Sequence, residues 1–285
     1  MSNDLHGGDE SGQWVDWEPS EPIDSPPPSE TLDWIETELG ATVVDVMPLP
    51  GGLSSAIHRL ELLDGRVVVL RRHVLADWME REPNVPADEA AILDLLPSVG
   101  LPTETPSLVL ADVDASHADV PALVMSEVRG RPDLAPPDPV SWAKALADCL
   151  AEIHAVDVDA VSELPAWRRW DEPDRPIPIW TDIPKRWQEA KELVATDLAV
   201  ETPCFLHRDF HPANVHWQDT EVVAVVDWLG ACVGEAAADL AHCRWNLAIL
   251  DSPALADTFT THYREQTGYE GDTADFDLST ILSAP

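Results

Sequence analysis

The feature that most constrains this chain is a polar segment enclosed by two short apolar runs. The first run ends just after Phe205, the second covers residues 222–226, and Asp227 closes it. The segment between them carries five polar side chains with chemical potential: His207, Arg208, Asp209, His211 and Asn214. Short apolar runs bounded by polar residues are typical of strands, and the second run is too hydrophobic for an exposed loop. The pattern predicts a strand, a loop that displays polar groups, and a second strand.

Two of these side chains, together with Asp227 after the second run, have a spacing that suits the transfer of a phosphoryl group. Such a site needs a carboxylate that orients the attacking hydroxyl, a side-chain amide that holds a metal ion, and a second carboxylate that bridges the metal to the triphosphate. Asp209, Asn214 and Asp227 fit these roles in that order. We expect Asp209 to be the catalytic residue, and Asn214 and Asp227 to bind Mg²⁺, which prefers oxygen ligands together with phosphate.

The ordered motifs resemble those of the aminoglycoside phosphotransferase family, which shares the fold of the protein kinases. Residues 207–214 are similar to the catalytic loop of that family, residues 227–230 to the segment with the metal-binding aspartate, and residues 239–242 to a stretch that follows it. The set in this order is far more specific than any single motif. The resemblance implies a bilobal α+β fold, ATP-dependent transfer of phosphate to a hydroxyl of a small molecule, and an Asp239 that holds the backbone of the catalytic loop.

Three segments are expected along the chain. Residues 1–29 are rich in Gly, Ser, acidic residues and proline, a composition that predicts a disordered tail. By the resemblance, residues 30–128 form a small antiparallel nucleotide-binding lobe, and residues 129–285 form a larger, mostly helical lobe that carries the catalytic and substrate sites. Large lobes of that family often extend further, which leaves room for additional helices beyond Pro285.

The small lobe is predicted to begin with an antiparallel meander. Residues 42–47, 56–63 and 66–72 have the β-branched and aliphatic content of strands, and Asp64-Gly65 is a strong signal for a hairpin turn. In a kinase-like lobe, the first turn covers the nucleotide phosphates, because glycines let backbone N–H groups approach the oxygens. The residues at that place are Gly51, Gly52, Ser54 and Ser55.

A basic strand end and a hinge complete the expected nucleotide site. Arg71 stands where the protein kinases have a phosphate-contacting lysine, as in a branch of the family with an Arg-Arg pair, and guanidinium can bind phosphate through two hydrogen bonds. Strand alternation turns Arg72 to the opposite face. The resemblance implies that Glu89 is the ion-pair partner of Arg71, and the adjacent Asp88 remains an alternative. Backbone groups of a hinge are implied to bind adenine: Ser126, Glu127 and Val128.

Helical periodicity dominates the second half of the chain. It predicts helices over residues 140–156, 182–193, 234–250 and 254–267. His154, near the end of the first of these helices, is expected to be a structural residue rather than a metal ligand.

The charge of the chain excludes several kinds of partner. Its 285 residues carry a formal net charge of -36, and no basic patch could neutralise the phosphates of a nucleic acid or an anionic membrane. The acidic residues are spread throughout, which favours a strongly solvated surface suited to high salt over an acidic cleft that draws in a cationic substrate. We expect a small-molecule substrate and a monomer or weak dimer.

The compartment follows from two missing signals and from the cysteines. No basic start followed by an apolar run marks a signal peptide, and no apolar run approaches the length of a membrane span. The cysteines lack paired metal-ligand spacing and are expected to be reduced thiols. The chain is therefore expected in the cytoplasm.

Two alternative functions remain open from the sequence. The spacing of His207, Asp209 and His211 permits a metallohydrolase, although further ligands would be needed and no clear motif provides them. The second alternative is a pseudokinase-like module that binds nucleotide without turnover.

Overall fold

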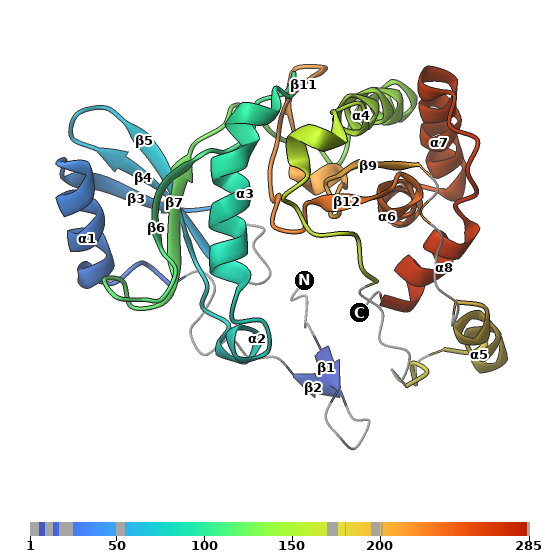
Figure 1. Cartoon of the computed structure of the whole chain (residues 1–285), viewed down its shortest axis with the longest axis horizontal. Coiled ribbons are helices and arrows are strands. Elements are labelled where there is room, and N and C mark those ends of the chain that lie inside the picture. The colour runs from blue at the N-terminus through green and yellow to red at the C-terminus, as the bar shows by residue number, and fades with distance from the viewer. Residues whose placement is uncertain are drawn as a thin grey trace. The chain divides into compact units, whose positions relative to one another are not determined.

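The computed structural model of the chain describes residues 6–8, 14–16, 25–49, 55–169, 176–179, 181–194, 200 and 202–283 (Figure 1). The chain divides into two compact units, of which unit 1 comprises Met1–Ser98 and Pro106–Val128, and unit 2 comprises Val99–Thr105 and Arg129–Pro285. Most of the tail predicted over residues 1–29 lies outside the described residues. Within it, the short strands β1 (His6–Gly8) and β2 (Trp14–Asp16) pair antiparallel.

Unit 1 is built on a five-stranded antiparallel sheet with the strand order β3-β4-β5-β7-β6. The strands are β3 (Val43–Pro48), β4 (Ala56–Leu62), β5 (Val67–Arg72), β6 (Leu108–Asp112) and β7 (Ala122–Ser126). The turn between β4 and β5 is closed by a hydrogen bond from the N–H of Gly65 to the carbonyl of Leu62. Gly65 has a φ of 87°, a conformation that favours glycine. The predicted antiparallel meander is confirmed.

Three helices accompany this sheet: α1 (Ser29–Leu39), α2 (Ala76–Arg81) and α3 (Val85–Val99). Trp34 and Ile35 of α1 pack with Leu60 and Leu70 of the sheet in one buried cluster. The helix ends at Gly40, which takes the left-handed conformation common after helix C-termini. The sequence gives no signal for α2, because this short helix buries no side chain and therefore shows no apolar periodicity.

Unit 2 contains the remaining helices and two small sheets. The helices are α4 (Pro139–His154), α5 (Pro184–Leu193), α6 (Ala237–Leu250), α7 (Pro253–Thr267) and α8 (Ala274–Ser283), with the short 3-10 turns η1 (Val158–Val161) and η2 (Pro212–Asn214). One sheet has the order β11-β10-β8 and the other pairs β12 with β9. Their strands are β8 (Arg131–Pro132), β9 (Pro203–Leu206), β10 (Val215–Gln218), β11 (Glu221–Val225) and β12 (Cys232–Glu235).

One sequence expectation about unit 2 is corrected. The two strands predicted around the polar loop are present as β9 and β11, of which β9 pairs with β12 and β11 pairs with β10. Gly234, expected at the start of a helix, belongs to β12 instead, because its backbone lies opposite Cys204 of β9. The helix starts at Ala237, and α8 had no counterpart among the predicted helices.

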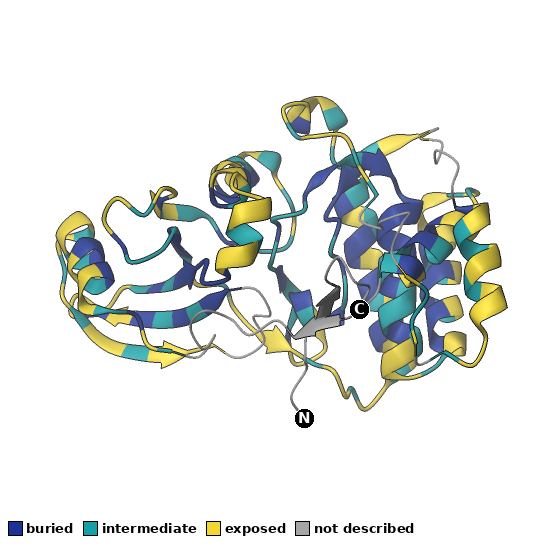
Figure 2. Cartoon of the chain, turned by 90° about the horizontal axis from the view of Figure 1, so that it is seen from below, coloured by how far each residue is buried: buried dark blue, intermediate teal, exposed yellow. Residues whose placement is uncertain are grey.

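The helices of unit 2 pack side by side, α4 against α7 and α6 against both α7 and α8. They carry their buried residues on the sides turned toward one another and their exposed residues outside (Figure 2). Under the polar loop, the rings of Phe205 and Trp228 stack with centroids 5.5 Å apart. This stack joins the end of β9 to the residue after Asp227.

Residues 99–105 join unit 2 through backbone pairing. The N–H of Glu104 donates to the carbonyl of Val223 at 2.9 Å, and the carbonyl of Glu104 accepts from the N–H of Val225 at 3.0 Å. Among the described helices, none is long and apolar enough to cross a lipid bilayer.

Candidate active site

The loop after β9 is held at its start by Asp239, in the first turn of α6. The buried carboxylate of Asp239 accepts the backbone N–H groups of His207 and Arg208, each at 2.8 Å. The Nε2 atom of His154 lies 3.2 Å from the same carboxylate, and its Nδ1 atom lies 2.7 Å from the hydroxyl oxygen of Tyr263. Burial would raise the pKa of Asp239, but the hydrogen bond and charge of His154, together with those of His207, lower it. The expected roles of Asp239 and His154 are confirmed.

Arg208 gives the loop its turn. Its φ of 76° lies in the left-handed region, which a residue with a side chain adopts only where surrounding contacts hold it. Its guanidinium donates to the carbonyl of Arg168 at 2.8 Å and lies 5.2 Å from the ring centroid of Trp167. These contacts and the Asp239 carboxylate fix the direction in which the chain reaches Asp209.

His207 is a buried structural residue of this loop. Its Nδ1 atom accepts the N–H of Asp209 at 3.2 Å, and its Nε2 atom lies 2.9 Å from the carbonyl oxygen of Val226, as a donor would. Burial lowers the pKa of His207 despite the carboxylates nearby, so the ring stays neutral. Because both ring nitrogens are used, His207 has no lone pair for a metal ion. The ligand set His207, Asp209 and His211, on which the metallohydrolase alternative depended, is therefore wrong.

The carboxylate of Asp209 lies at the open side of the loop, with 32% of its side chain exposed. Its Oδ1 atom is 2.9 Å from Nε2 of His242, and its Oδ2 atom accepts from Nδ2 of Asn214 at 3.2 Å. Nε2 of His211 is 3.8 Å from Oδ2. Burial would raise the pKa of Asp209, but the hydrogen bond and charge of His242, together with His211 and His207, lower it to about 2. This carboxylate is ionised at neutral pH.

Sequence reasoning did not assign His242 to the site. The signal was present in the spacing, since His242 follows Asp239 by three residues on α6 and residues three apart share a helix face. A helix that reaches the loop with Asp239 therefore also reaches it with His242.

Asn214 and Asp227 are brought together by the backbone. The N–H of Val226 donates to the carbonyl of Asn214 at 2.9 Å, which ties the residue before Asp227 to the end of the loop. Nδ2 of Asn214 also donates to the carbonyl of Asp209 at 2.9 Å, so the amide oxygen is the atom that a cation would meet. Asp227 has a left-handed φ of 64°. An amide oxygen and a carboxylate are both ligand types that Mg²⁺ prefers.

In unit 1, Arg71 and Glu89 form a buried ion pair. Burial would raise the pKa of Glu89, but the charge and hydrogen bond of Arg71, together with those of His73, lower it. Asp88, the alternative partner of Arg71, is exposed, and Glu89 is the residue that forms the ion pair. His73, which sequence reasoning missed, lies with Nε2 3.3 Å from Oε2 of Glu89, because alternation puts it on the same face as Arg71. Arg72, which was predicted to face the other way from Arg71, forms an ion pair with Asp119.

The other expected nucleotide contacts are less complete. Gly51, Gly52 and Ser54 lie outside the described residues, while Ser55 is buried just before β4. At the hinge, the N–H of Ser126 already donates to the carbonyl of Ser107 at 2.9 Å, because β7 pairs there with the residues before β6.

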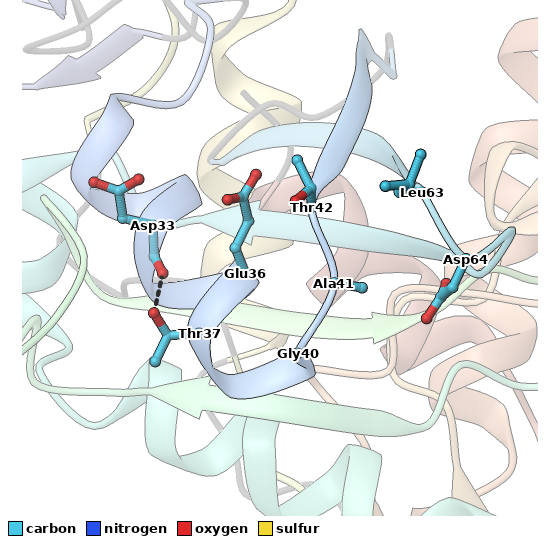
Figure 3. Close-up of a pocket in the computed structure, with 8 residues that line it drawn as sticks. All are labelled: Asp33, Glu36, Thr37, Gly40, Ala41, Thr42, Leu63 and Asp64. Carbon is cyan, nitrogen blue, oxygen red and sulfur yellow. Dashed lines mark hydrogen bonds between the residues drawn. The ribbon is translucent and has the colours of Figure 1, made fainter.

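An open hollow of unit 1 lies between the end of α1 and the β4–β5 turn (Figure 3). Three of its lining residues are acidic, but Glu36 accepts the N–H of Val43 and Asp64 pairs with Arg66. The hydroxyl of Thr37 donates to the carbonyl of Asp33, as Figure 3 shows. None of the residues predicted to take part in phosphoryl transfer lines this hollow.

Comparisons with known proteins bear on this geometry. The model of the phosphotransferase enzyme family, APH, matches residues 45–273 of the chain. No curated protein matches it. Among solved structures, macrolide 2'-phosphotransferase MphH from Brachybacterium faecium is 20% identical, with 89% of this chain and 88% of that chain covered and a TM-score of 0.62.

Two further solved structures are similar. Aminoglycoside phosphotransferase APH(3'')-Id from Streptomyces rimosus is 16% identical over 89% of this chain and 96% of its own, with a TM-score of 0.63. Amicoumacin kinase hAmiN, in complex with AMP-PNP and Ca²⁺, is 14% identical over 84% of this chain and 78% of its own, with a TM-score of 0.60. These similarities confirm the expected α+β fold, and the family match covers most of the chain. The chain therefore belongs to the phosphotransferase enzyme family.

Proposed function

We propose that this chain transfers the γ-phosphate of ATP to a hydroxyl group of a small molecule, with Mg²⁺ as the metal. The observation that carries the proposal is the ionised, one-third exposed carboxylate of Asp209 beside Asn214 and close in the chain's fold to Asp227. The nucleotide analogue and divalent cation in the amicoumacin kinase complex support the choice of cofactors. The names of the similar structures, which are macrolide and aminoglycoside phosphotransferases, support a small-molecule acceptor.

In the proposed reaction the protein forms no covalent bond to the substrates, and it acts by positioning them and by stabilising charge. The acceptor oxygen attacks the γ-phosphorus, the bond to the β–γ bridging oxygen breaks, ADP leaves, and the hydroxyl proton passes to the Asp209 carboxylate. Because the pKa of that carboxyl is about 2, Asp209 acts mainly by orienting the hydroxyl and takes the proton late, as the new P–O bond forms. Mg²⁺, when bound by Asn214 and Asp227, supplies positive charge to the phosphates.

In the proposed function, unit 1 binds the nucleotide and unit 2 carries the residues that act on the acceptor hydroxyl. In this proposal Arg71 binds phosphate, and Glu89 keeps the guanidinium extended by its buried ion pair. Residues 30–128 serve as the nucleotide-binding lobe and residues 129–285 as the catalytic lobe. The net charge of -36 repels polyanions, so the proposal includes no nucleic-acid or membrane partner, and it places a monomer or weak dimer in the cytoplasm.

The proposal is tested by phosphate transfer to a panel of hydroxylated small molecules. The full chain is incubated with ATP labelled at the γ-phosphate, Mg²⁺ and high salt, with aminoglycosides, macrolides, amino alcohols and sugars as separate acceptors. The expected result is acceptor-dependent transfer of label with one ADP formed per product. Saturable binding of ATP without label on any acceptor would instead identify a nucleotide-binding module.

Replacing Asn214 by Ala should raise the Mg²⁺ concentration needed for half-maximal turnover. Loss of groups around a metal typically weakens its binding by about 10–100-fold, and removal of a direct oxygen ligand should cost at least that much. The measurement is a Mg²⁺ titration of phosphate transfer at saturating ATP. Asn84→Ala, at an exposed asparagine before α3, is the control and should titrate like the wild type. An unchanged Mg²⁺ requirement in Asn214→Ala would remove this residue from the metal site.

Salt should stabilise the fold strongly. A net charge of -36 on one chain repels itself, and raising the ionic strength from 0.1 to 1 M shortens the screening length from about 10 to about 3 Å. We expect the melting temperature, followed by circular dichroism, to rise by roughly 10 °C or more over this range, as in proteins adapted to high salt, since about 1 kcal/mol shifts Tm by a few degrees in a chain of this size. Sucrose, which stabilises without screening charge, is the control. A melting temperature insensitive to salt contradicts the adaptation.

A further inference from the structure

We propose that His242 is a positioning residue, whose Nε2–H holds the carboxylate of Asp209 in the orientation that receives the acceptor hydroxyl. The inference deepens the function proposed above and depends on it. Nε2 of His242 lies 2.9 Å from Oδ1 of Asp209, and only 15% of the His242 side chain is exposed. His242 and Asp239 project from one face of α6, so the helix that fixes the backbone of the loop also fixes its carboxylate.

The two oxygens of Asp209 are held from different elements. His242 of α6 contacts Oδ1, while Nδ2 of Asn214, at the end of η2, donates to Oδ2 at 3.2 Å. The terminal torsion of an aspartate is broad when nothing restrains it. Contacts at both oxygens stop this rotation, and the exposed third of the side chain is then presented in one orientation. A displacement of a reacting group by about 1 Å can cost about 100-fold in rate, so this restraint matters for turnover.

A metal site is the competing interpretation of the same cluster. Ligand atoms of Asp209, His211 and His242 all lie within 4.8 Å of one another. Nδ1 of His211, however, accepts the N–H of Ala213 at 3.3 Å, so the proton of its neutral ring is on Nε2, the atom that faces Asp209. A protonated nitrogen cannot bind a metal. Burial also lowers the pKa of His211, which keeps the ring neutral despite the Asp209 carboxylate. The cluster therefore consists of donors around one carboxylate.

The test compares His242→Leu with His242→Gln. Glutamine can place an N–H near the position of the imidazole Nε2, whereas leucine has similar bulk and no donor. We expect His242→Leu to lower kcat by about 10–100-fold with the KM for ATP changed less than about 3-fold, and His242→Gln to keep kcat within about 3-fold of the wild type. Equal losses in both variants, or no loss in either, would overturn the proposal.

The chain offers a matched control. His262 makes the same kind of contact with a different aspartate, since its Nε2 atom lies 2.8 Å from Oδ1 of Asp148 in the α4–α7 region. His262→Leu and His262→Gln should leave kcat and KM unchanged. Loss of turnover in His262→Leu as large as in His242→Leu would show a general effect on the helices of unit 2 and would also overturn the proposal.

Two measurements separate this proposal from the proposed function. The ¹⁵N spectrum of the histidine side chains in the wild type should show a proton on Nε2 of His242, and a bare Nε2 would refute the contact whatever the activity. A wild type that transfers phosphate to no acceptor would refute the proposed function instead. Calorimetric titration of the wild type with Zn²⁺ should show no stoichiometric binding at this cluster. Stoichiometric binding in the wild type that is lost in His242→Gln would make the cluster a metal site.

Discussion

Replacing Asp209 by Asn is expected to lower kcat by about 1000-fold while the protein remains folded. Loss of a positioned proton acceptor typically costs between about 100-fold and 10,000-fold, and the amide can neither take the hydroxyl proton nor attract it with a full negative charge. The fold should survive because Asn keeps the shape of Asp and its oxygen can still accept from His242, 2.9 Å away. Rates of phosphate transfer and the melting temperature are measured on the same preparation.

Asp148→Asn is the control for this variant, because Asp148 also bonds to a histidine but lies on the surface of α4. It should match the wild type in both kcat and melting temperature. The KM for ATP in Asp209→Asn should change little, since Asp209 meets the acceptor and not the nucleotide in the proposed reaction. Turnover of Asp209→Asn within a few-fold of the wild type would remove Asp209 from the chemistry and, with it, the proposed function.

Replacing Asp239 by Asn is expected to destabilise the chain by about 3–5 kcal/mol. The fully buried carboxylate of Asp239 accepts two backbone N–H groups and contacts His154, and breaking a buried charged pair costs about this much. An amide in its place offers one acceptor oxygen and turns an N–H₂ group toward a donor. The free energy of unfolding is measured by denaturant titration in high salt, and activity is measured on the folded fraction.

The pH dependence distinguishes this mechanism from a packing defect. Folding lowers the pKa of Asp239, so its carboxylate stabilises the fold fully above its unfolded pKa of about 3.9, and this stabilisation is lost as the pH falls through the folded value. The stability gap between wild type and Asp239→Asn should therefore narrow below about pH 4. Asp257→Asn, at an exposed carboxylate paired with Arg244, should change stability by less than about 0.5 kcal/mol. A gap that stays constant with pH would contradict the role of the charge.

Much of the candidate site follows from the order of residues. The distances along the chain from Asp209 to Asn214 and from there to Asp227 are short, so a loop and one hairpin bring them into one region whatever surrounds them. The β3-β4-β5 meander of unit 1 was equally accessible, because these three strands are consecutive and Asp64-Gly65 joins β4 to β5. The pairing of Arg71 with Glu89 instead of Asp88 needed the helix phase, which α3 supplies by burying Glu89.

The sequence by itself determined which residues could do phosphoryl-transfer chemistry, because local spacing and strand or helix periodicity decide which side chains share a face. Only the tertiary structure decided that β9 pairs with β12, that residues 99–105 join unit 2, and that His242 meets Asp209. Those contacts join segments far apart in the chain: backbone pairing joins β9 to β12 and Glu104 to β11, and the position of α6 beside the loop brings His242 to Asp209. Local spacing indicates only that His242 shares a face of its helix with Asp239. Contacts between residues far apart in the sequence depend on how the whole core packs, which the local sequence does not specify.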